Sequence, residues 1–163
     1  MNLHKIIIIG PESSGKTTLC EQLSKYLNLP FSKEYSREYL DALKRDYNFD
    51  DLLKIAKEQL KSELNSQLLD TDLITLKIWS EYKYGSCDKW ILTQIEKQKS
   101  EKRFYLLCKP DIPWKADPLR ENPNNREELF ELYKEELGNL GHNYFIVEGG
   151  NKVEQAIYQI LQL

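Results

Sequence analysis

The octapeptide Gly-Pro-Glu-Ser-Ser-Gly-Lys-Thr at residues 10–17 constrains this chain more than any other feature. It fits the pattern G-x-x-x-x-G-K-[ST] completely. The run Lys5–Ile9 before it is short, apolar and β-branched, which favours a buried parallel strand. Residues 16–27 after it place Leu19, Leu23 and Leu27 on one helical face. A glycine-rich loop is therefore predicted to join a buried strand to a helix, and this context disfavours a chance glycine turn.

Such a loop has the chemistry of an anion cradle. Glycines let the backbone fold so that several N–H groups point inward, and the helix N-terminus adds positive potential. Lys16 is expected to reach the β- and γ-phosphates of ATP, and the Thr17 hydroxyl is expected on Mg²⁺. The predicted nucleotide-binding residues are Gly10, Glu12, Ser13, Ser14, Gly15, Lys16, Thr17 and Thr18.

The rest of the chain alternates strand and helix signals. Further strands are predicted at 31–32, 68–70, 104–108 and 144–147. Further helices are predicted over 34–45, from 50, from 73 to Gly85, after Asp88 and from 153. One more helix is predicted after Asn124, which would cap it together with Glu127 in a capping box. This alternation predicts a three-layer α/β/α P-loop NTPase fold of the nucleoside- and nucleotide-kinase type, with a parallel sheet of about five strands. We expect one domain over residues 1–163.

Composition narrows the partners and the compartment. The net charge is −3, so no basic face for nucleic acid is indicated. The three cysteines have no C-x-x-C spacing, which is typical of a reducing compartment. There is no signal-peptide pattern, and residues 6–9 are too short a run for a membrane span. A cytoplasmic protein without membrane partners is expected; the oligomeric state is not indicated.

Carboxylates follow two of the predicted strands. Asp70 and Asp72 end one of them, at the sheet edge where ligands bind in doubly wound folds. Asp70 is predicted to orient the water shell of Mg²⁺, and Asp72 either to contact substrate or to cap the next helix. Glu34 follows another strand and is a candidate base for a substrate hydroxyl. Arg37 either binds substrate or phosphate or forms an exposed ion pair with Glu34.

Residues 110–126 form a proline-rich stretch that is predicted to act as a lid. Arg120 and Arg126 within it are candidates for the transferring phosphate, while the alternative is solvated arginines, with Arg126 serving its own helix. Trp114 in the stretch, and Trp79 after Asp72, offer planes that can stack on a ring; for Trp79 core packing is the alternative.

These elements together resemble a known family. Residues 10–18, Glu34-Tyr35-Ser36-Arg37-Glu38-Tyr39, Asp70-Thr71-Asp72, residues 79–85, and Trp114 with Arg120 and Arg126 are similar to the ribosylnicotinamide kinase domain of NadR-type proteins. The chain looks most like the short stand-alone members of that family. The resemblance implies NAD biosynthesis chemistry: transfer of phosphate from ATP to the 5′-hydroxyl of nicotinamide riboside, with Tyr35 among the substrate contacts.

Two features depart from the family pattern. No H-x-G-H motif of an adenylyltransferase is found, so we expect that this chain does not make NAD by itself. The bifunctional members carry a tryptophan before the Glu-Tyr element that helps to sandwich the pyridine ring, and here that position is Lys33. The region for the partner tyrosine, near Gln59, has no aromatic residue either. A kinase for another nucleoside or metabolite, and an ATPase or nucleotide-sensing module, therefore remain open.

Overall fold

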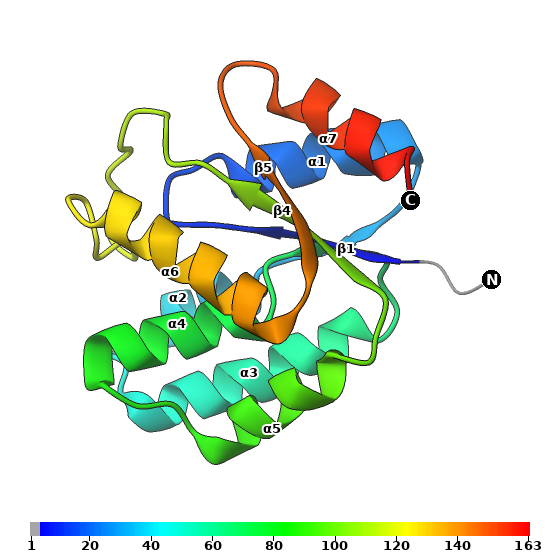
Figure 1. The fold of residues 1–163 in the computed structure, drawn as a ribbon. Coiled ribbons are helices and arrows are strands. Elements are labelled where there is room, and N and C mark those ends of the chain that lie inside the picture. Colours follow the sequence, from blue (N-terminus) through cyan, green and yellow to red (C-terminus); the bar gives the residue numbers. More distant parts are fainter. Residues whose placement is uncertain (1–3) are drawn as a thin grey trace.

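The computed structural model describes residues 4–163 and contains a five-stranded parallel sheet (Figure 1). The strands are β1 (Lys5–Ile9), β2 (Phe31–Ser32), β3 (Leu68–Asp70), β4 (Arg103–Cys108) and β5 (Asn143–Val147). Their order in the sheet is β2-β3-β1-β4-β5, and every pairing is parallel. The predicted fold class and all five predicted strands are thus confirmed.

Helices cover both faces of this sheet. They are α1 (Lys16–Leu27), α2 (Tyr35–Ala42), α3 (Phe49–Glu63), α4 (Leu73–Tyr84), α5 (Lys89–Gln98), α6 (Arg126–Leu140) and α7 (Lys152–Ile160). Helices α1 and α7 lie together on one face, and α3 to α6 lie on the other (Figure 1). Within residues 4–163, no helix is both long enough and apolar enough to cross a bilayer.

The central strand β1 explains why two separate cores form. Ile6 and Ile8 pack with α1 and α7, whereas Ile7 and Ile9 pack with the helices of the opposite face. All four side chains are at most 7% exposed. Each one contributes about 1.5–3 kcal/mol by leaving water. A strand that is buried on both faces fixes the loop that leaves its carboxyl end.

Two predicted helix boundaries are wrong. The helix predicted over 34–45 ends at Ala42, and Arg45 instead hydrogen-bonds to the buried Asp51 carboxylate at 2.7 and 3.0 Å. Helix α6 begins at Arg126, with Asn125 at its N-cap and no side-chain cap hydrogen bond, so the Asn124 capping box does not form. A capping box does form at the start of α3, between Asn48 and Asp51.

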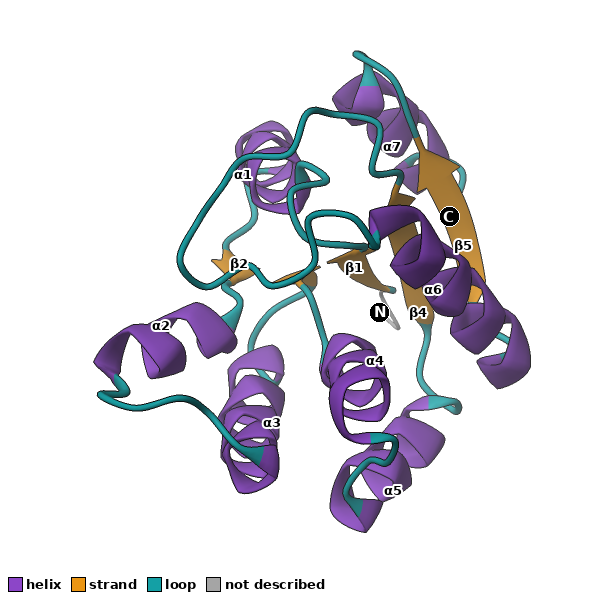
Figure 2. Ribbon diagram, turned by 90° about the vertical axis from the view of Figure 1, so that its left-hand side faces the viewer, coloured by secondary structure: helices purple, strands orange, loops and turns teal. Residues whose placement is uncertain are grey.

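The irregular segment between β4 and α6 places part of the chain over the sheet edge. It crosses in front of the carboxyl ends of the strands, between α1, α2 and α6 (Figure 2). The loop that follows β1 and the turn that follows β3 end at this same edge. Side chains from segments far apart in the sequence therefore meet there.

Candidate active site

The loop at residues 10–15 is shaped by tight backbone geometry. Gly10 leaves β1 with a φ of 149°, and a Cβ atom there would lie 2.7 Å from the carbonyl oxygen of Cys108. Gly15 has a φ of 86° and stands at the N-cap of α1. Ser13, between them, also has a left-handed φ of 55°. The two glycines of the motif are thus needed for a close approach and for a left-handed turn.

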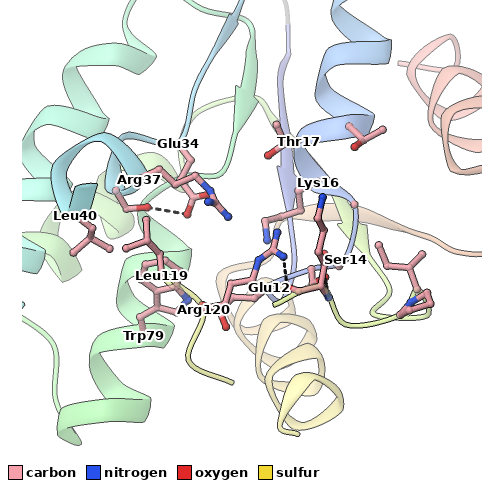
Figure 3. Close-up of a pocket in the computed structure, with 17 residues that line it drawn as sticks. Glu12, Ser14, Lys16, Thr17, Glu34, Arg37, Leu40, Trp79, Leu119 and Arg120 are labelled. Carbon is pink, nitrogen blue, oxygen red and sulfur yellow. Dashed lines mark hydrogen bonds between the residues drawn. The ribbon is translucent and has the colours of Figure 1, made fainter. Parts of the chain in front are cut away.

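Lys16 lies folded over this loop. Its Nζ donates to the carbonyl oxygens of Gly10 and Pro11 at 2.8 and 2.9 Å, and the hydroxyl of Ser14 also donates to Pro11 at 2.7 Å. Figure 3 shows the Lys16 side chain on the cavity side of the loop. An ammonium group held only by neutral carbonyls keeps its charge available for an anion.

A carboxylate and a hydroxyl meet beside the lysine. The Thr17 hydroxyl donates to Oδ2 of Asp70 at 2.9 Å. Asp70 is 2% exposed, and its Oδ1 atom has no hydrogen-bond partner among residues 4–163. Burial, reinforced by the nearby Glu34 carboxylate, raises the pKa of Asp70 to about 6, against the opposing charge of Lys16.

This donor set fits a magnesium ion that is held largely through phosphate. Mg²⁺ prefers oxygen ligands and usually takes one or two from the protein, with the remainder from water and phosphates. Thr17 and Asp70 supply a hydroxyl and a carboxylate of that kind, and the unpartnered Oδ1 of Asp70 is free to accept from metal-bound water. The part of the chain that the structure describes has no cluster of three or more metal-ligand side chains, so a dedicated protein cage is absent there.

Glu34 lies at the start of α2, on the opposite side of the same cavity from the loop (Figure 3). Its Oε1 accepts a hydrogen bond from Ser36 at 2.9 Å. Arg37 pairs with Asp117 at 3.1 Å, so the only ion pair that the structure gives it within residues 4–163 leads to the segment over the sheet edge.

That segment is tied to the loop at several points. The Lys115 amide donates to the Ser13 hydroxyl at 3.0 Å. The Glu12 carboxylate accepts from the amides of Glu121 and Asn122 at 3.2 and 3.1 Å. Burial raises the pKa of Glu12, which these amides oppose. The loop and residues 110–126 are therefore held as one unit.

The two arginines predicted to face the phosphate differ in position. Arg120 lines the cavity and donates to the carbonyl oxygen of Lys115. Arg126 donates to the carbonyl oxygens of Ser13 and Ile112, both at 2.9 Å. Each guanidinium lies about 6 Å from the Trp114 ring, at 6.0 and 5.7 Å respectively. Arg126 thus braces the loop from outside, and Trp114 lies against the two arginines.

The cavity between the loop, the start of α2 and residues 110–126, which we call the phosphate cavity, has a volume of about 350 Å³. Predicted site residues that line it are Glu12, Ser13, Ser14, Gly15, Lys16, Thr17, Thr18, Glu34, Arg37, Trp79 and Arg120. Residues that line it without having been singled out are Ser36, Leu40, Ile112, Pro113, Lys115 and Leu119. Their only signal in the sequence was their position close to predicted site residues.

The predicted site residues that do not line the cavity are Gly10, Tyr35, Asp70, Asp72, Trp114 and Arg126. Asp72 is fully buried; its Oδ1 caps α4 through the Ile74 amide at 3.0 Å, so the helix-cap alternative is what the structure contains, and the predicted substrate contact is not. Its Oδ2 accepts from Arg103 and Tyr105 at 2.9 and 2.7 Å. The Tyr35 ring packs against the core beneath α2, and its amide donates to Gln59.

The chain is similar in sequence to a known protein family and to curated proteins. A family model described as an AAA domain matches residues 5–155. The trifunctional NAD biosynthesis/regulator protein NadR of Salmonella typhimurium is 26% identical over 126 residues, which are 71% of this chain and 30% of that protein. The chain thus spans about a third of the length of the curated relatives it matches, and the resemblance to NadR-type proteins is confirmed.

Solved structures agree on the fold. The crystal structure of NadR in complex with NR has a TM-score of 0.78 and 23% identity, and the match covers 99% of this chain and 51% of that one. Deoxyadenosine kinase from M. mycoides with bound dCTP has a TM-score of 0.64 and 18% identity, with 97% and 99% covered. At these identities the structures establish the shared architecture alone.

Proposed function

The chain belongs to the AAA domain family of P-loop proteins, and from that premise we propose that it is an ATP- and Mg²⁺-dependent kinase that phosphorylates a small nucleoside. Nicotinamide riboside is the proposed acceptor and nicotinamide mononucleotide the product. The observation that carries the proposal is that Lys16, Thr17 and Glu34 line one cavity, while the buried Asp70 carboxylate accepts a hydrogen bond from Thr17 behind it. A nucleotide-binding loop alone does not indicate that a second substrate receives the phosphate. A carboxylate across the cavity from the loop, here Glu34, can bind and deprotonate the hydroxyl group of such a substrate.

The triphosphate binds in the loop. The Lys16 ammonium leaves the two carbonyls for the more negative phosphate oxygens, which it binds more strongly because the acceptor is charged. Backbone amides at the start of α1 add donors and the positive end of the helix dipole. Thr17 and Asp70 would hold Mg²⁺, which when bound neutralises the phosphate charge.

Glu34 is assigned the role of base. The acceptor hydroxyl attacks the γ-phosphorus in line, so one P–O bond forms to the hydroxyl oxygen while the bond to the bridging oxygen of ADP breaks. The hydroxyl proton passes to the Glu34 carboxylate, and ADP leaves with the electron pair of the broken bond. Ser36, which donates to Glu34 at 2.9 Å, holds the carboxylate in position.

Residues 110–126 are proposed to act as the lid, with Arg120 as the guanidinium that meets the transferring phosphate. Arg120 already lines the cavity, and a cation aimed at developing charge lowers the barrier most when water is excluded. Arg126 and Glu12 keep the lid in register with the loop through backbone contacts.

The nature of the acceptor is supported by similarity to NadR, whose solved complex contains NR. The proposal is tested by incubating the protein with ATP, Mg²⁺ and single nucleosides, nicotinamide riboside first, and measuring product by mass spectrometry and ADP by coupled assay. We expect a phosphorylated nucleoside in equal amount to ADP. Lys16→Ala is expected to abolish transfer, and Glu34→Gln to lower the rate far more than it weakens ATP binding.

The alternatives give different products. A kinase for another nucleoside would leave nicotinamide riboside untouched and phosphorylate a different member of the panel. An ATPase module would release inorganic phosphate at a rate that no nucleoside changes. A fully active Glu34→Gln enzyme would remove the base role while leaving the kinase assignment intact.

A further inference from the structure

A second cavity of about 260 Å³ adjoins the phosphate cavity, and we call it the side cavity. The two share four lining residues: Glu12, Leu40, Trp79 and Leu119. The side cavity is completed by Tyr47, Tyr82, Lys83, Glu121, Asn122 and Leu129. Figure 3 shows Leu40, Trp79 and Leu119 together, across the phosphate cavity from Lys16 and Thr17. The side cavity therefore extends from the wall opposite Lys16 and Thr17 and reaches Glu12 of the phosphate-binding loop.

The lining of the side cavity suits a flat ring. Three aromatic residues contribute to it, Tyr47 from the loop before α3 and Trp79 and Tyr82 from α4. Leucines from α2, the lid segment and α6 complete the apolar part. Cavities that bind small molecules combine such apolar and aromatic walls with a few placed polar groups, and planar rings gain from contact with aromatic faces.

The polar groups of the side cavity form a connected set. Glu121 accepts from Lys83 at 3.1 Å and from the Tyr47 hydroxyl at 2.9 Å. The Lys83 ammonium lies 3.8 Å from the centre of the Tyr47 ring. Burial raises the pKa of Tyr47 to about 12, so its hydroxyl keeps its proton. An ammonium has three donors, so Lys83 has N–H groups to offer a carbonyl oxygen while it remains paired with Glu121.

Lys33 and Gln59, the two positions at which the resemblance predicts ring-stacking aromatic residues, line neither cavity. Gln59, at the position where the resemblance leads one to look for an aromatic residue, is 1% exposed, and its Oε1 accepts from the Tyr35 amide at 2.9 Å. Lys33 is exposed and does not line either cavity. Neither position therefore offers an aromatic face for a ring.

We propose that the side cavity holds the ring of the phosphoryl acceptor, a planar heteroaromatic ring that carries an amide group, with Lys83 as the residue that recognises the amide oxygen. This proposal rests on the proposed kinase function and adds to it the place and polarity of ring recognition. The ribose then lies between the cavities, with its hydroxyl at Glu34 and its ring past Trp79. Tyr47 is a positioning residue, because it holds Glu121 and lies beneath the Lys83 ammonium.

The test pairs a change in the protein with a change in the ligand. Wild type and Lys83→Met are assayed with nicotinamide riboside and with pyridine riboside, which lacks the carboxamide. A hydrogen bond from a charged donor contributes about tenfold in affinity at a partly exposed site. We expect the wild type to have a KM about tenfold higher for pyridine riboside, and Lys83→Met to have nearly equal KM values for the two ligands, with the KM for ATP unchanged.

Controls separate this role from a structural one. Lys57→Met removes a lysine that also lies over an aromatic ring, 5.7 Å from the centre of Trp90, but outside both cavities, and it should behave as wild type. Tyr47→Phe keeps the ring and removes the bond to Glu121; it should narrow the difference between the two ribosides without altering the KM for ATP. If Lys83→Met raises both KM values equally, or neither, ring recognition by Lys83 is overturned.

Failure of the kinase assignment would look different. If the wild type phosphorylates neither riboside, the same four combinations are measured as binding by calorimetry. A carboxamide-dependent affinity that disappears in Lys83→Met would support the side cavity without the transfer reaction. Equal affinities of the wild type for the two ribosides would overturn the proposal independently of any activity.

Discussion

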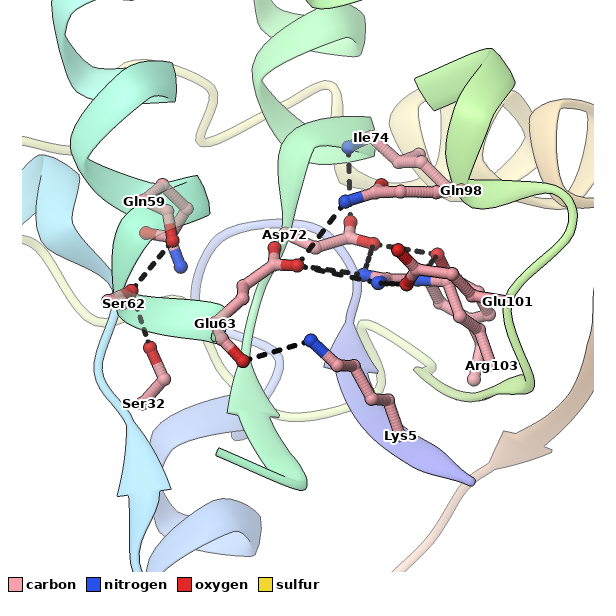
Figure 4. Close-up of polar contacts among 11 residues, drawn as sticks. Lys5, Ser32, Gln59, Ser62, Glu63, Asp72, Ile74, Gln98, Glu101 and Arg103 are labelled. Carbon is pink, nitrogen blue, oxygen red and sulfur yellow. Dashed lines mark hydrogen bonds and ion pairs between the residues drawn. The ribbon is translucent and has the colours of Figure 1, made fainter. Parts of the chain in front are cut away.

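Asp70 and Asp72 stand on either side of Thr71 at the end of one strand, yet they belong to two opposite kinds of environment. Asp70 faces the phosphate-binding loop, with one oxygen bound to Thr17 and the other without a partner among residues 4–163. Asp72 is buried beside Arg103 and the start of α4, and both of its oxygens are hydrogen-bonded (Figure 4). Thr71 separates the two carboxylates in a left-handed conformation, with a φ of 74°.

The difference shows how a buried carboxylate is either bound fully by the protein or left with an oxygen available to a ligand. Arg103 is fully buried and binds Asp72 at 2.9 Å, Glu63 at 3.4 Å and Glu101 at 2.8 Å. Asp72 is thus bound directly by a buried cation, which it shares with Glu63, a carboxyl group whose pKa is raised to about 7 by burial and by the nearby Asp72 charge. Asp70 is also buried, but no basic side chain among residues 4–163 forms an ion pair with it. An incoming ion or metal-bound water gains most at such a site.

The largest expected effect is a loss of stability when the cation that binds Asp72 is removed. Arg103→Met leaves two carboxylates, Asp72 and Glu63, buried without their cation. Breaking a buried ion pair from one side costs roughly 3–5 kcal/mol, and we expect a loss of that size in the free energy of unfolding measured in urea. The double variant Arg103→Met/Asp72→Asn should recover part of the loss. A loss below about 1 kcal/mol would show that the cluster is not structural.

A somewhat smaller effect is expected on the reactive side. Asp70→Asn keeps the shape of the residue and removes the charge that we propose to orient the metal-bound water. Removing a preorganised electrostatic group lowers kcat by about 10²–10³-fold. The unfolding free energy should not fall, because the variant also removes a buried charge. Steady-state kinetics and urea unfolding on the same preparation separate the two quantities, and a destabilised but active Asp70→Asn enzyme would reverse the assignment.

The pH dependence of stability sharpens the comparison further. The pKa of Asp70 is raised from 3.8 to about 6 in the folded chain, mainly by burial, so the folded state holds the proton more tightly than the unfolded state. Its contribution to stability is therefore greatest below the unfolded pKa and is lost as pH rises to about 6. Without ligand, wild type should lose stability relative to Asp70→Asn over this window, which thermal unfolding measures. A difference that does not change with pH would contradict the burial of Asp70.

The smallest effect is expected for an exposed ion pair, which serves as the reference for the buried carboxylates Asp70 and Asp72. Lys134 pairs with Glu131 at 3.0 Å on the exposed surface of α6. Exposed pairs of this kind contribute little, so Lys134→Ala should change the unfolding free energy by less than about 0.5 kcal/mol and leave kcat unaltered. The unfolding free energies of Lys134→Ala and Arg103→Met are measured side by side in urea. An equal loss of stability in the two variants would mean that burial does not determine how much an ion pair contributes.

The sequence allowed the reactive side to be predicted better than the structural side. The loop and the Asp70 position depend on local signals: a β-branched strand, glycines at a close approach and a left-handed turn, and an acid at a strand end. These signals act over a few residues. Because β3 lies next to β1 in the sheet, the Thr17 hydroxyl then lies 2.9 Å from Oδ2 of Asp70.

The remaining features depend on contacts between distant residues. Asp72 is bound by Arg103, 31 residues further along the chain, and no spacing pattern announces such a partner. Arg126 donates to the carbonyl of Ser13, 113 residues earlier, so its bracing role was not visible in a proline-rich stretch. The predicted start of α6 was one residue too early, because Asn124 and Asn125 are both suitable N-cap residues and the local sequence does not distinguish them.

A single-turnover experiment tests the central claim most directly. The protein, in excess over ATP labelled at the γ-phosphate, is mixed with Mg²⁺ and nicotinamide riboside, and the label is followed through one reaction cycle. We predict that the label appears on the riboside, and that Asp70→Asn and Lys16→Ala slow its arrival. Label recovered only as inorganic phosphate, or ATP left intact by the wild type, would contradict the account.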